Sequence, residues 1–244
     1  GLTPQTIDDF THPQCSRDII DFILVQRALS LGGFDREFVF HQGNFDARNI
    51  RMLIKGILLV SFDSIWYSHA ILHEQDVYIS DPVIRKGEYW AGIFTAPKNL
   101  TRLKIQTLND FRQLSVVSSR DWYVDWQTLT KIHPKELLHE PDWLSMAKLV
   151  SLGWVDVMLA PFNRHYPFRY ESSRYQLQAV EGVKLALEDS RHFVVSKQHP
   201  EGERAFNAIQ LGLQQLRQTG FIERAYRECG FFNERVKDWL LLNP

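Results

Sequence analysis

Two stretches of the chain share one pattern of apolar and polar positions. The first starts at Asn49 and reads NIRMLIKG, ILLVSF and DSIWYSH; the second starts at Ser145 and reads SMAKLVSLG, WVDVMLA and PFNRHYP. Each begins as a short amphipathic helix that ends at a glycine, Gly56 or Gly153, because glycine readily adopts the left-handed conformation that closes a helix. The apolar run that follows does not alternate, which predicts a strand buried on both faces of a parallel sheet.

A polar and aromatic loop follows each predicted strand of this repeat. Open α/β sheets bind their ligands at the carboxyl ends of the strands, where such loops lie. Two copies of the unit therefore predict an α/β chain of two lobes whose loops face one cleft.

The rest of the chain continues to alternate between helical and extended patterns. The spacing of apolar residues predicts helices at 16–31, 107–111, 120–132 and 179–189, and further helices within the tail at 201–242. Strands are expected at 36–41, 89–95, 114–119, 135–140 and 191–196, with a turn region at 79–90. No linker is rich in glycine, serine or proline, so we expect strands to join the lobes.

Composition limits the classes of function. The 244 residues are 44% hydrophobic, enough for sizeable cores, and the formal charge of -1 offers no basic surface for nucleic acid. Aromatic residues make up 13%, which is enough to supply a stacking pocket as well as the cores. No apolar stretch approaches the roughly 18 residues that a membrane span needs. The first residue is Gly1 and not Met, which is compatible with an exported protein whose signal peptide has been removed.

The two cysteines, Cys15 and Cys229, lie near opposite ends of the chain and have no metal-ligand or CxxC spacing. If the two ends pack together in one lobe, the cysteines can form a disulfide, as is typical of exported proteins. Otherwise they are two separate buried thiols. The sequence leaves both alternatives open.

Three long segments resemble the type II periplasmic solute-binding proteins, the family that includes the amino-acid receptors of ABC transporters. ISDPVIRKGEYWAGIF resembles the family's turn before its first crossing strand, and LKIQTLNDFRQLSVVSSRDW resembles the opening of its second lobe. FVVSKQHPEGERAFNAIQLGLQQLRQTGFIERAYRECG resembles the family's C-terminal ending. The resemblance covers nearly the whole chain, and its C-terminal part is the most specific.

The resemblance implies an α/β protein with the two-lobed periplasmic binding protein type II fold and two hinge strands. Lobe 1 would comprise residues 1–91 and 194–244, and lobe 2 would be inserted at 92–193. The hinge strands would lie near 89–95 and 192–196. In this family the ligand binds between the lobes, which close over it by hinge motion.

Two departures from the family bear on the ligand. Where amino-acid receptors carry an arginine that grips the ligand carboxylate, the chain has His73. Where the second lobe usually holds the ligand amine with a carboxylate, it has Ala160, Pro161 and Phe162. Both grips on a zwitterion are missing, which argues against a standard L-amino acid. The helix from Trp122 to Leu129 also resembles a branch of solitary binding-protein-like chains, for which no transporter partner is implied.

The first candidate binding loop contains Asp63, Ser64, Trp66 and Tyr67, directly after the first repeated strand. The aromatic rings offer faces for stacking on a ring or sugar, while the carboxylate and the hydroxyl offer hydrogen bonds. The alternative is a loop whose aromatic residues only cover the core of the first lobe.

The second candidate region lies between a predicted strand and helix, at Ser118, Ser119 and Arg120. A helix start presents free N–H groups that hold an anion, and an arginine adds a planar charged fork. The alternative is a simple N-cap by Ser119 beside a solvated Arg120. Asn163 and Arg164, with His165, follow the second repeated strand and offer polar contacts, unless this loop is merely solvated.

Trp90, at the start of an expected hinge strand, is the last candidate, with a role either in the cleft floor or in a core. Enzyme signals are weak: the histidines are scattered, with no HExxH, GxSxG or phosphate-loop pattern. We therefore predict a non-catalytic, monomeric, periplasmic protein without cofactor or metal that binds a small polar ligand. A transporter receptor, with a membrane permease as partner, a ligand-sensing or interaction module, and an enzyme on the same fold are the three competing functions.

Overall fold

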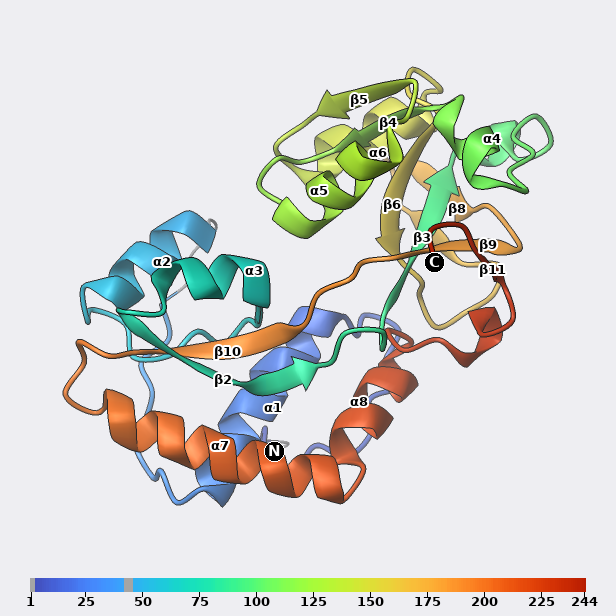
Figure 1. Ribbon diagram of the computed structural model, residues 1–244. Helices are drawn as coiled ribbons and strands as arrows, with labels where there is room; N and C mark the ends of the chain where they lie inside the picture. Colours follow the sequence, from blue (N-terminus) through green and yellow to red (C-terminus); the bar gives the residue numbers. More distant parts are fainter. Residues whose placement is uncertain (1–2, 42–45) are drawn as a thin grey trace. The chain divides into compact units, whose positions relative to one another are not determined.

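The computed structural model describes residues 3–41 and 46–244, which form two compact units (Figure 1). Unit 1 is formed by the chain up to Arg85 together with Asp189–Cys229. Unit 2 is formed by Lys86–Glu188 together with Gly230–Pro244. The two sheets are separate, one in each unit, so no sheet runs through both copies of the repeated pattern.

Unit 1 has a small antiparallel sheet of three strands in the order β1-β10-β2. Its strands are β1 (Ile65–Trp66), β2 (Val77–Ile84) and β10 (Arg191–Ser196). Its helices are α1 (Arg17–Leu31), α2 (Asp46–Ile54), α3 (Tyr67–Ala70), η1 (Ile71–His73), α7 (Gly202–Gln218) and α8 (Phe221–Cys229).

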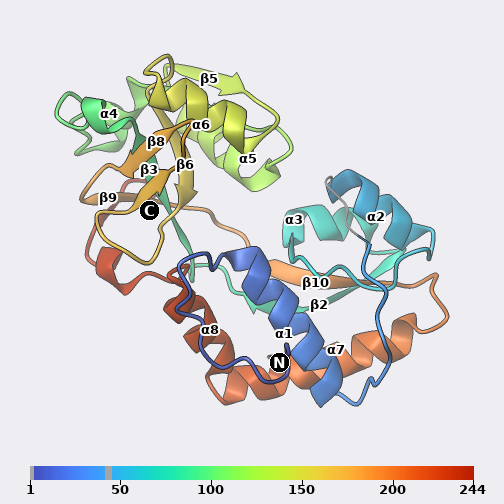
Figure 2. The same cartoon turned by 180° about the vertical axis from the view of Figure 1, so that it is seen from behind.

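Helices α1 and α7 pack along each other in unit 1, with α8 beside them (Figures 1 and 2). Their contact is close because Gly212 of α7 lies against the backbone of Ala28 in α1: an added Cβ would come within 2.0 Å of the Ala28 oxygen. Ile20, Leu24 and Leu29 of α1 are buried, as the 3.6-residue period predicts.

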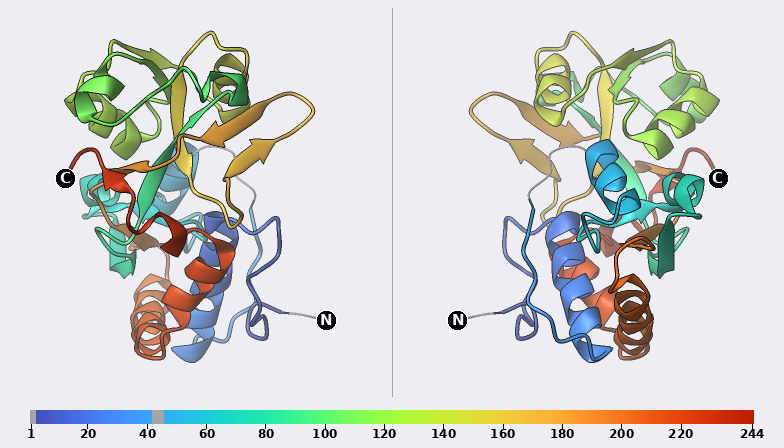
Figure 3. Two further views of the ribbon diagram at one scale, coloured as in Figure 1. Left: turned by 90° about the vertical axis from the view of Figure 1, so that its right-hand side faces the viewer. Right: turned by 90° about the vertical axis from the view of Figure 1, so that its left-hand side faces the viewer.

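Unit 2 has a larger mixed sheet in the order β11-β9-β3-β6-β4-β5, with β8 also paired to β3 and β7 to β8. Its strands are β3 (Trp90–Thr95), β4 (Ser115–Ser118), β5 (Glu136–His139), β6 (Val157–Pro161), β7 (Arg169–Glu171), β8 (Gln176–Ala179), β9 (Val183–Ala186) and β11 (Leu240–Leu241). Its helices are η2 (Pro97–Asn99), α4 (Leu108–Arg112), α5 (Tyr123–Ile132), α6 (Trp143–Ser151) and η3 (Glu234–Val236). Figure 3 shows β7 and β8 as a two-stranded ribbon at the side of this sheet.

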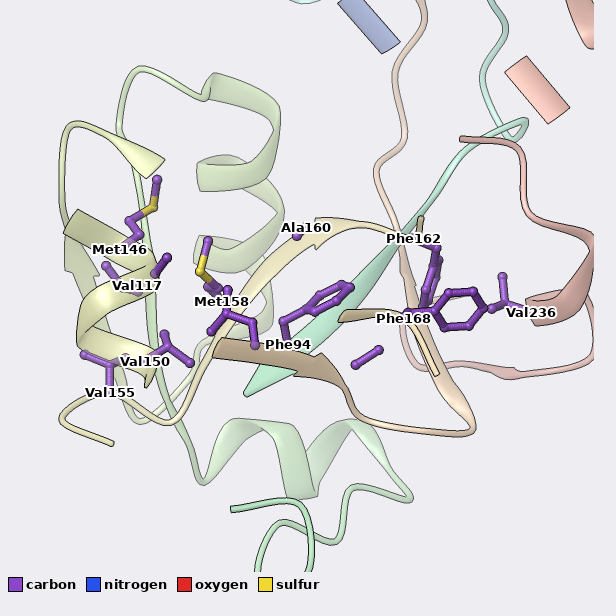
Figure 4. Close-up of a cluster of buried hydrophobic side chains, with 13 residues drawn as sticks. Phe94, Val117, Met146, Val150, Val155, Met158, Ala160, Phe162, Phe168 and Val236 are labelled. Carbon is purple, nitrogen blue, oxygen red and sulfur yellow. The ribbon is translucent and has the colours of Figure 1, made fainter. Parts of the chain in front are cut away.

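The core of unit 2 collects side chains from β3, β4, β6, β8 and α6 (Figure 4). Phe94, Met158 and Phe168 are fully buried in it. Val236 from the C-terminal segment packs into the same cluster, next to Phe168 in Figure 4. Removing such residues from water supplies most of the favourable free energy of folding.

The repeated pattern is half confirmed. In both copies the helix is present, as α2 and α6, and the glycines that follow, Gly56 and Gly153, have φ values of 74° and 81°. The second apolar run forms β6, which pairs with β4 in parallel and with β3 in the opposite direction. The first run is not a regular strand; only Val60 forms an isolated bridge, to Val195. An apolar run becomes a strand only where neighbouring backbone is available for pairing.

Most of the other predicted elements are present as α1, β3, α4, β4, α5, β5 and β10. Three predictions are wrong. Residues 36–41 form no strand, and the turn expected at 79–90 is confined to residues 85–89, because β2 continues through Pro82 to Ile84 with irregular register against β10. The expected helix at 179–189 contains the strand β9, because pairing with β3 and β11 overrides the local helical pattern.

The boundaries of the units differ from those expected of the lobes. Residues 230–244 belong to unit 2 and not to the first lobe, because β11 pairs with β9 and Asn243 hydrogen-bonds to both backbone groups of Ala186. The chain therefore passes from one unit to the other three times, after Arg85, Glu188 and Cys229. The strands expected as hinges lie just beyond two of these points: β3 is part of the unit 2 sheet and β10 of the unit 1 sheet.

Cys15 and Cys229 form a disulfide within unit 1, with their Cα atoms 5.4 Å apart, so the alternative of two free thiols is wrong. The bond joins the two segments of the unit across 214 residues of sequence. Among residues 3–41 and 46–244, no helix is both long and apolar enough to cross a membrane.

We predict that the double variant Cys15→Ser, Cys229→Ser is less stable than the wild type by about 2–4 kcal/mol, because a disulfide restricts the unfolded chain and the closed loop here is long. Urea unfolding measures this loss, and the wild type under reducing conditions should show the same one. An unchanged midpoint in both samples would show that the disulfide contributes nothing to the stability of unit 1.

Candidate functional site

The four candidates of unit 1 lie on one short segment that runs from the Val60 bridge to the start of α3. Ser64 precedes β1, Trp66 ends it, and Tyr67 begins α3. Asp63 and Tyr67 are exposed, Trp66 is partly buried and Ser64 is buried. The segment thus presents a carboxylate and aromatic side chains, while Ser64 fixes it from below.

Ser64 is held by the buried carboxylate of Asp21 in α1. The amide N–H of Ser64 donates to Oδ2 of Asp21 at 2.9 Å, and the Ser64 hydroxyl donates to the same oxygen. Arg17 and the Tyr226 hydroxyl also donate to Asp21. Burial raises the pKa of Tyr226, which is therefore a neutral donor. These bonds tie the candidate segment to α1 and α8.

Asp63 is bound to Arg17, whose Nη1 lies 2.7 Å from its Oδ1. Burial acts to raise the pKa of Asp63, but the attraction of Arg17 and Arg191 outweighs it and the pKa lies below the ordinary value of 3.8. The Asp63 side chain keeps 50% of its exposure. It is therefore an ionised carboxylate that is both fixed and accessible.

Arg191 of β10 lies under the same segment. Its Nε donates to Oγ of Ser64 at 2.8 Å and its Nη2 donates to the Ser64 carbonyl. The guanidinium lies over the ring of Trp66, with its carbon 4.7 Å from the ring centroid. Burial, and then repulsion from Arg17, lower the pKa of Arg191 to about 10.

Tyr67 packs against His192, with 5.3 Å between the ring centroids. His192 is buried, and its Nδ1 and Nε2 lie 2.7 Å from the Ser80 carbonyl and the Ser190 hydroxyl. Burial lowers the pKa of His192, which favours the neutral ring. The amide N–H of Tyr67 donates to the Ser190 carbonyl, so the start of α3 is fixed to the segment before β10.

In unit 2, Ser118 and Ser119 are buried at the end of β4 and do not cap α5. That helix begins at Tyr123, with Trp122 at its N-cap position. The Ser119 hydroxyl accepts the amide N–H of Asp121, forming a local turn. The alternative of a simple N-cap by Ser119 is therefore wrong, because the chain makes this turn before the helix starts at Tyr123.

Arg120 is exposed beside this turn. Its amide N–H donates to Nδ1 of His139, and its guanidinium lies 5.4 Å from the ring centroid of Trp126. His139 also packs edge-on against Trp126. Arg120 and His139 thus both contact the ring of Trp126. The guanidinium of Arg120 remains accessible to an anion.

Trp90 and the loop after β6 lie elsewhere in unit 2. The ring of Trp90 packs against the core, with Nζ of Lys184 3.7 Å from its centroid. Lys184 is buried and donates to the carbonyls of Val236 and Lys237. Burial lowers its pKa.

Asn163 has a structural role in its loop: its Nδ2 donates to the carbonyl of Arg169, and its own carbonyl accepts from Asn233. Arg164 is exposed. The hydrogen-bond pattern ties this part of the loop after β6 to β7 and the C-terminal segment.

The residues at the two departures are also placed. His73 ends η1, with its ring 5.9 Å from that of His69. Pro161 ends β6 and its carbonyl accepts the Tyr170 hydroxyl, while Phe162 is buried in the core. The position that the resemblance gives to an amine-binding carboxylate is thus taken up by packing.

Four residues of these contacts were not predicted from the sequence: Arg17, Asp21, Arg191 and Lys184. One signal was available for Asp21, since it lies on the apolar side of α1 with Leu24 and Ala28, where an acidic residue needs a partner. Arg191 and Lys184 lie within extended segments and gave no such signal. In the part of the chain that the structure describes, no group of three or more metal-ligating side chains exists.

No protein-family model and no curated protein matches the chain. Solved structures do match it. A probable amino-acid ABC transporter extracellular-binding protein from Bacillus subtilis is 16% identical, with a TM-score of 0.64 over 86% of each chain. The GluR0 ligand-binding core from Nostoc punctiforme, solved with L-glutamate, is 14% identical, with a TM-score of 0.57 over 91% of this chain and 95% of that one.

A third structure with this likeness is the ancestral amino-acid-binding protein AncCDT-1, described as a precursor of cyclohexadienyl dehydratase. It is 16% identical, with a TM-score of 0.59 over 88% of this chain and 85% of that one. At these identities the likeness shows the fold. The chain has the α/β fold of the type II periplasmic binding proteins, which confirms the fold class expected from the sequence.

We predict that Asp63→Asn reduces the sensitivity of the protein to acid. Because the pKa of Asp63 is lowered in the folded state, its ion pair stabilises the fold above pH 4 or so, and this contribution is lost as the pH falls through the lower folded value. The free energy of unfolding should therefore fall less steeply between about pH 5 and pH 3 in Asp63→Asn. Urea titrations across this range measure the slope.

Asp35→Asn, which alters an exposed carboxylate of the same unit, is the control for this pH series. Equal slopes for the wild type and Asp63→Asn would contradict the assignment of the Arg17–Asp63 pair as a stabilising contact.

Proposed function

We propose that the chain is a non-catalytic solute-binding protein that holds a small polar ligand. The observation that carries the proposal is the fold, because the structures that share it include amino-acid binding proteins and the GluR0 ligand-binding core. A fold alone does not set a function, so the ligand must be argued from the side chains.

The candidate ligand-binding groups are the Asp63–Tyr67 segment in unit 1 and the Ser118–Arg120 turn in unit 2, with Trp90, Asn163 and Arg164 as weaker candidates. The first two combine accessible charge with aromatic surface: Asp63 beside Trp66 and Tyr67, and Arg120 on Trp126. Such surfaces suit a ligand that has both a polar group and a flat face.

We propose a periplasmic location and a monomer. The disulfide supports the location, since such bonds persist in oxidising compartments. A membrane permease is the expected partner if the protein delivers its ligand, because some of the similar structures are binding proteins of ABC transporters. The likeness to a GluR0 ligand-binding core favours a second candidate, a ligand-sensing module that acts on another partner.

We further propose that standard L-amino acids are not the ligands. His73 stands where the resemblance implies an arginine, and Pro161 and Phe162 are engaged in the structure of unit 2. The apolar side chains of Pro161 and Phe162 cannot replace a carboxylate that binds an ammonium ion.

A thermal-shift screen against polar metabolites tests the proposed function. A ligand at a hundred times its dissociation constant should raise the stability of the native state by about 2.7 kcal/mol. Trp66→Ala should reduce the shift, whereas Trp154→Ala, which alters an exposed tryptophan of unit 2 outside the candidate groups, should not. Micromolar binding of a standard L-amino acid in calorimetry would refute the proposed selectivity, and a screen with no shifting compound would count against the function.

Arg120→Ala tests the candidate turn of unit 2. If Arg120 binds an anionic group of the ligand, its loss should weaken binding about tenfold or more, since a hydrogen bond to a charged group contributes about 1.5–3 kcal/mol. Thermal stability without ligand should hardly change, because the side chain is exposed. Arg120→Lys should recover only part of the affinity. Calorimetry with the ligand from the screen measures both, and equal affinities would place Arg120 outside the site.

A further inference from the structure

We propose that Arg191 is the group in unit 1 that binds a carboxylate of the ligand. The inference rests on the proposed function and goes beyond it by naming the residue and the chemical class that it selects. It follows from the way in which the guanidinium is held, and neither the repeated pattern nor the resemblance pointed to this residue.

The guanidinium of Arg191 has donors to spare. Arginine carries five N–H donors, and here Nε and Nη2 donate to Ser64. Among residues 3–41 and 46–244, no carboxylate forms an ion pair with Arg191. The negative charges of Asp21 and Asp63 attract this guanidinium, but neither carboxylate bonds to it, so it lacks the direct anionic partner that such groups usually have.

The unused nitrogen, Nη1, keeps contact with solvent. In the described part of the chain, every side-chain nitrogen or oxygen that is fully buried has a hydrogen-bond partner. The hydrogen bonds of Arg191 are made by Nε and Nη2, and Nη1 makes none. Nη1 is therefore not fully buried. It is thus a donor at the surface of unit 1 that Ser64 does not use.

The surroundings favour an anion at this nitrogen. Trp66 covers one face of the guanidinium at 4.7 Å and excludes water there, which strengthens a charge-assisted hydrogen bond. The nearby carboxylates are already engaged: Asp21 accepts from Arg17, Ser64 and Tyr226, and Asp63 accepts from Arg17.

A carboxylate fits this arrangement better than a larger anion. The fork of an arginine matches the planar geometry of a carboxylate, and the contact with Ser64 already fixes the plane of the guanidinium. Arg191 would thus supply in unit 1 the carboxylate grip that is missing at His73. The favoured ligand is therefore an organic acid, for which no α-amino group is needed at Arg191.

Arg191 has a structural role as well, because it anchors Ser64 and pairs with Trp66 in the sheet. The test must therefore separate binding from anchoring. Arg191→Lys keeps the positive charge, Arg191→Gln removes it, and Arg204→Gln is the matched control, since Arg204 also lies over an aromatic ring of unit 1, Phe34, at 5.3 Å.

The probes are propionate and benzoate, their uncharged counterparts propionamide and benzamide, L-alanine and inorganic phosphate. Calorimetry on the full chain at constant ionic strength should show that the wild type prefers each carboxylate to its amide by at least tenfold. Arg191→Gln should abolish this preference, Arg191→Lys should keep part of it, and Arg204→Gln should keep all of it. Tryptophan fluorescence should change with benzoate in the wild type and not in Trp66→Phe.

Each other result overturns the inference. Equal binding of acids and amides by the wild type would do so without recourse to any variant, even if Arg191→Gln fails to fold. A carboxylate preference that survives in Arg191→Gln but is lost in Arg120→Ala would assign the anion to unit 2. Tighter binding of phosphate or of L-alanine than of propionate would refute the ligand class. No binding of any acid would end the inference, while the metabolite screen alone decides the proposed function.

Discussion

A carboxylate that is withdrawn from water loses solvation worth several kcal/mol unless partners replace it, and Asp21 is fully buried in unit 1. Its partners come from three parts of the chain: Arg17 on the same helix, Ser64 before β1, and Tyr226 on α8. Satisfying this one charge therefore fixes where the Asp63–Tyr67 segment lies on α1. The buried carboxylate of Asp21 thus determines where the accessible side chains of Asp63 and Tyr67 lie.

The same constraint operates in unit 2 through a cation. Lys184 is buried and reaches the carbonyls of Val236 and Lys237, while Trp90 covers the ammonium group. These contacts, with the β11–β9 pairing, explain why the C-terminal segment belongs to unit 2. Trp90 thus packs against the core of unit 2 and covers Lys184.

What could be predicted from the sequence was local. The period of apolar residues in α1 and the capping box of α4, where Thr107 and Asp110 bond each other's backbone, are written in adjacent residues. The pairing of one strand with another is not determined by such local patterns. The run at 57–62 looked like β6 but obtains only the Val60 bridge, and the helical pattern at 179–189 gives way to pairing of β9 with two strands. The disulfide likewise depends on how the chain ends meet.

The candidate site shows the same difference between local patterns and long-range contacts. The exposed members of the Asp63–Tyr67 segment could be predicted, because a polar loop that follows an apolar run is visible in the sequence. Arg191 could not be predicted, because it belongs to a different stretch of sequence and meets the loop only when β10 pairs with β1. A residue such as Arg191 can perform the role of a residue at another position without belonging to a recognisable sequence motif. The loss of an arginine at His73 therefore does not by itself remove carboxylate binding from the fold. What is missing at this position is the arginine that the resemblance implies for amino-acid receptors.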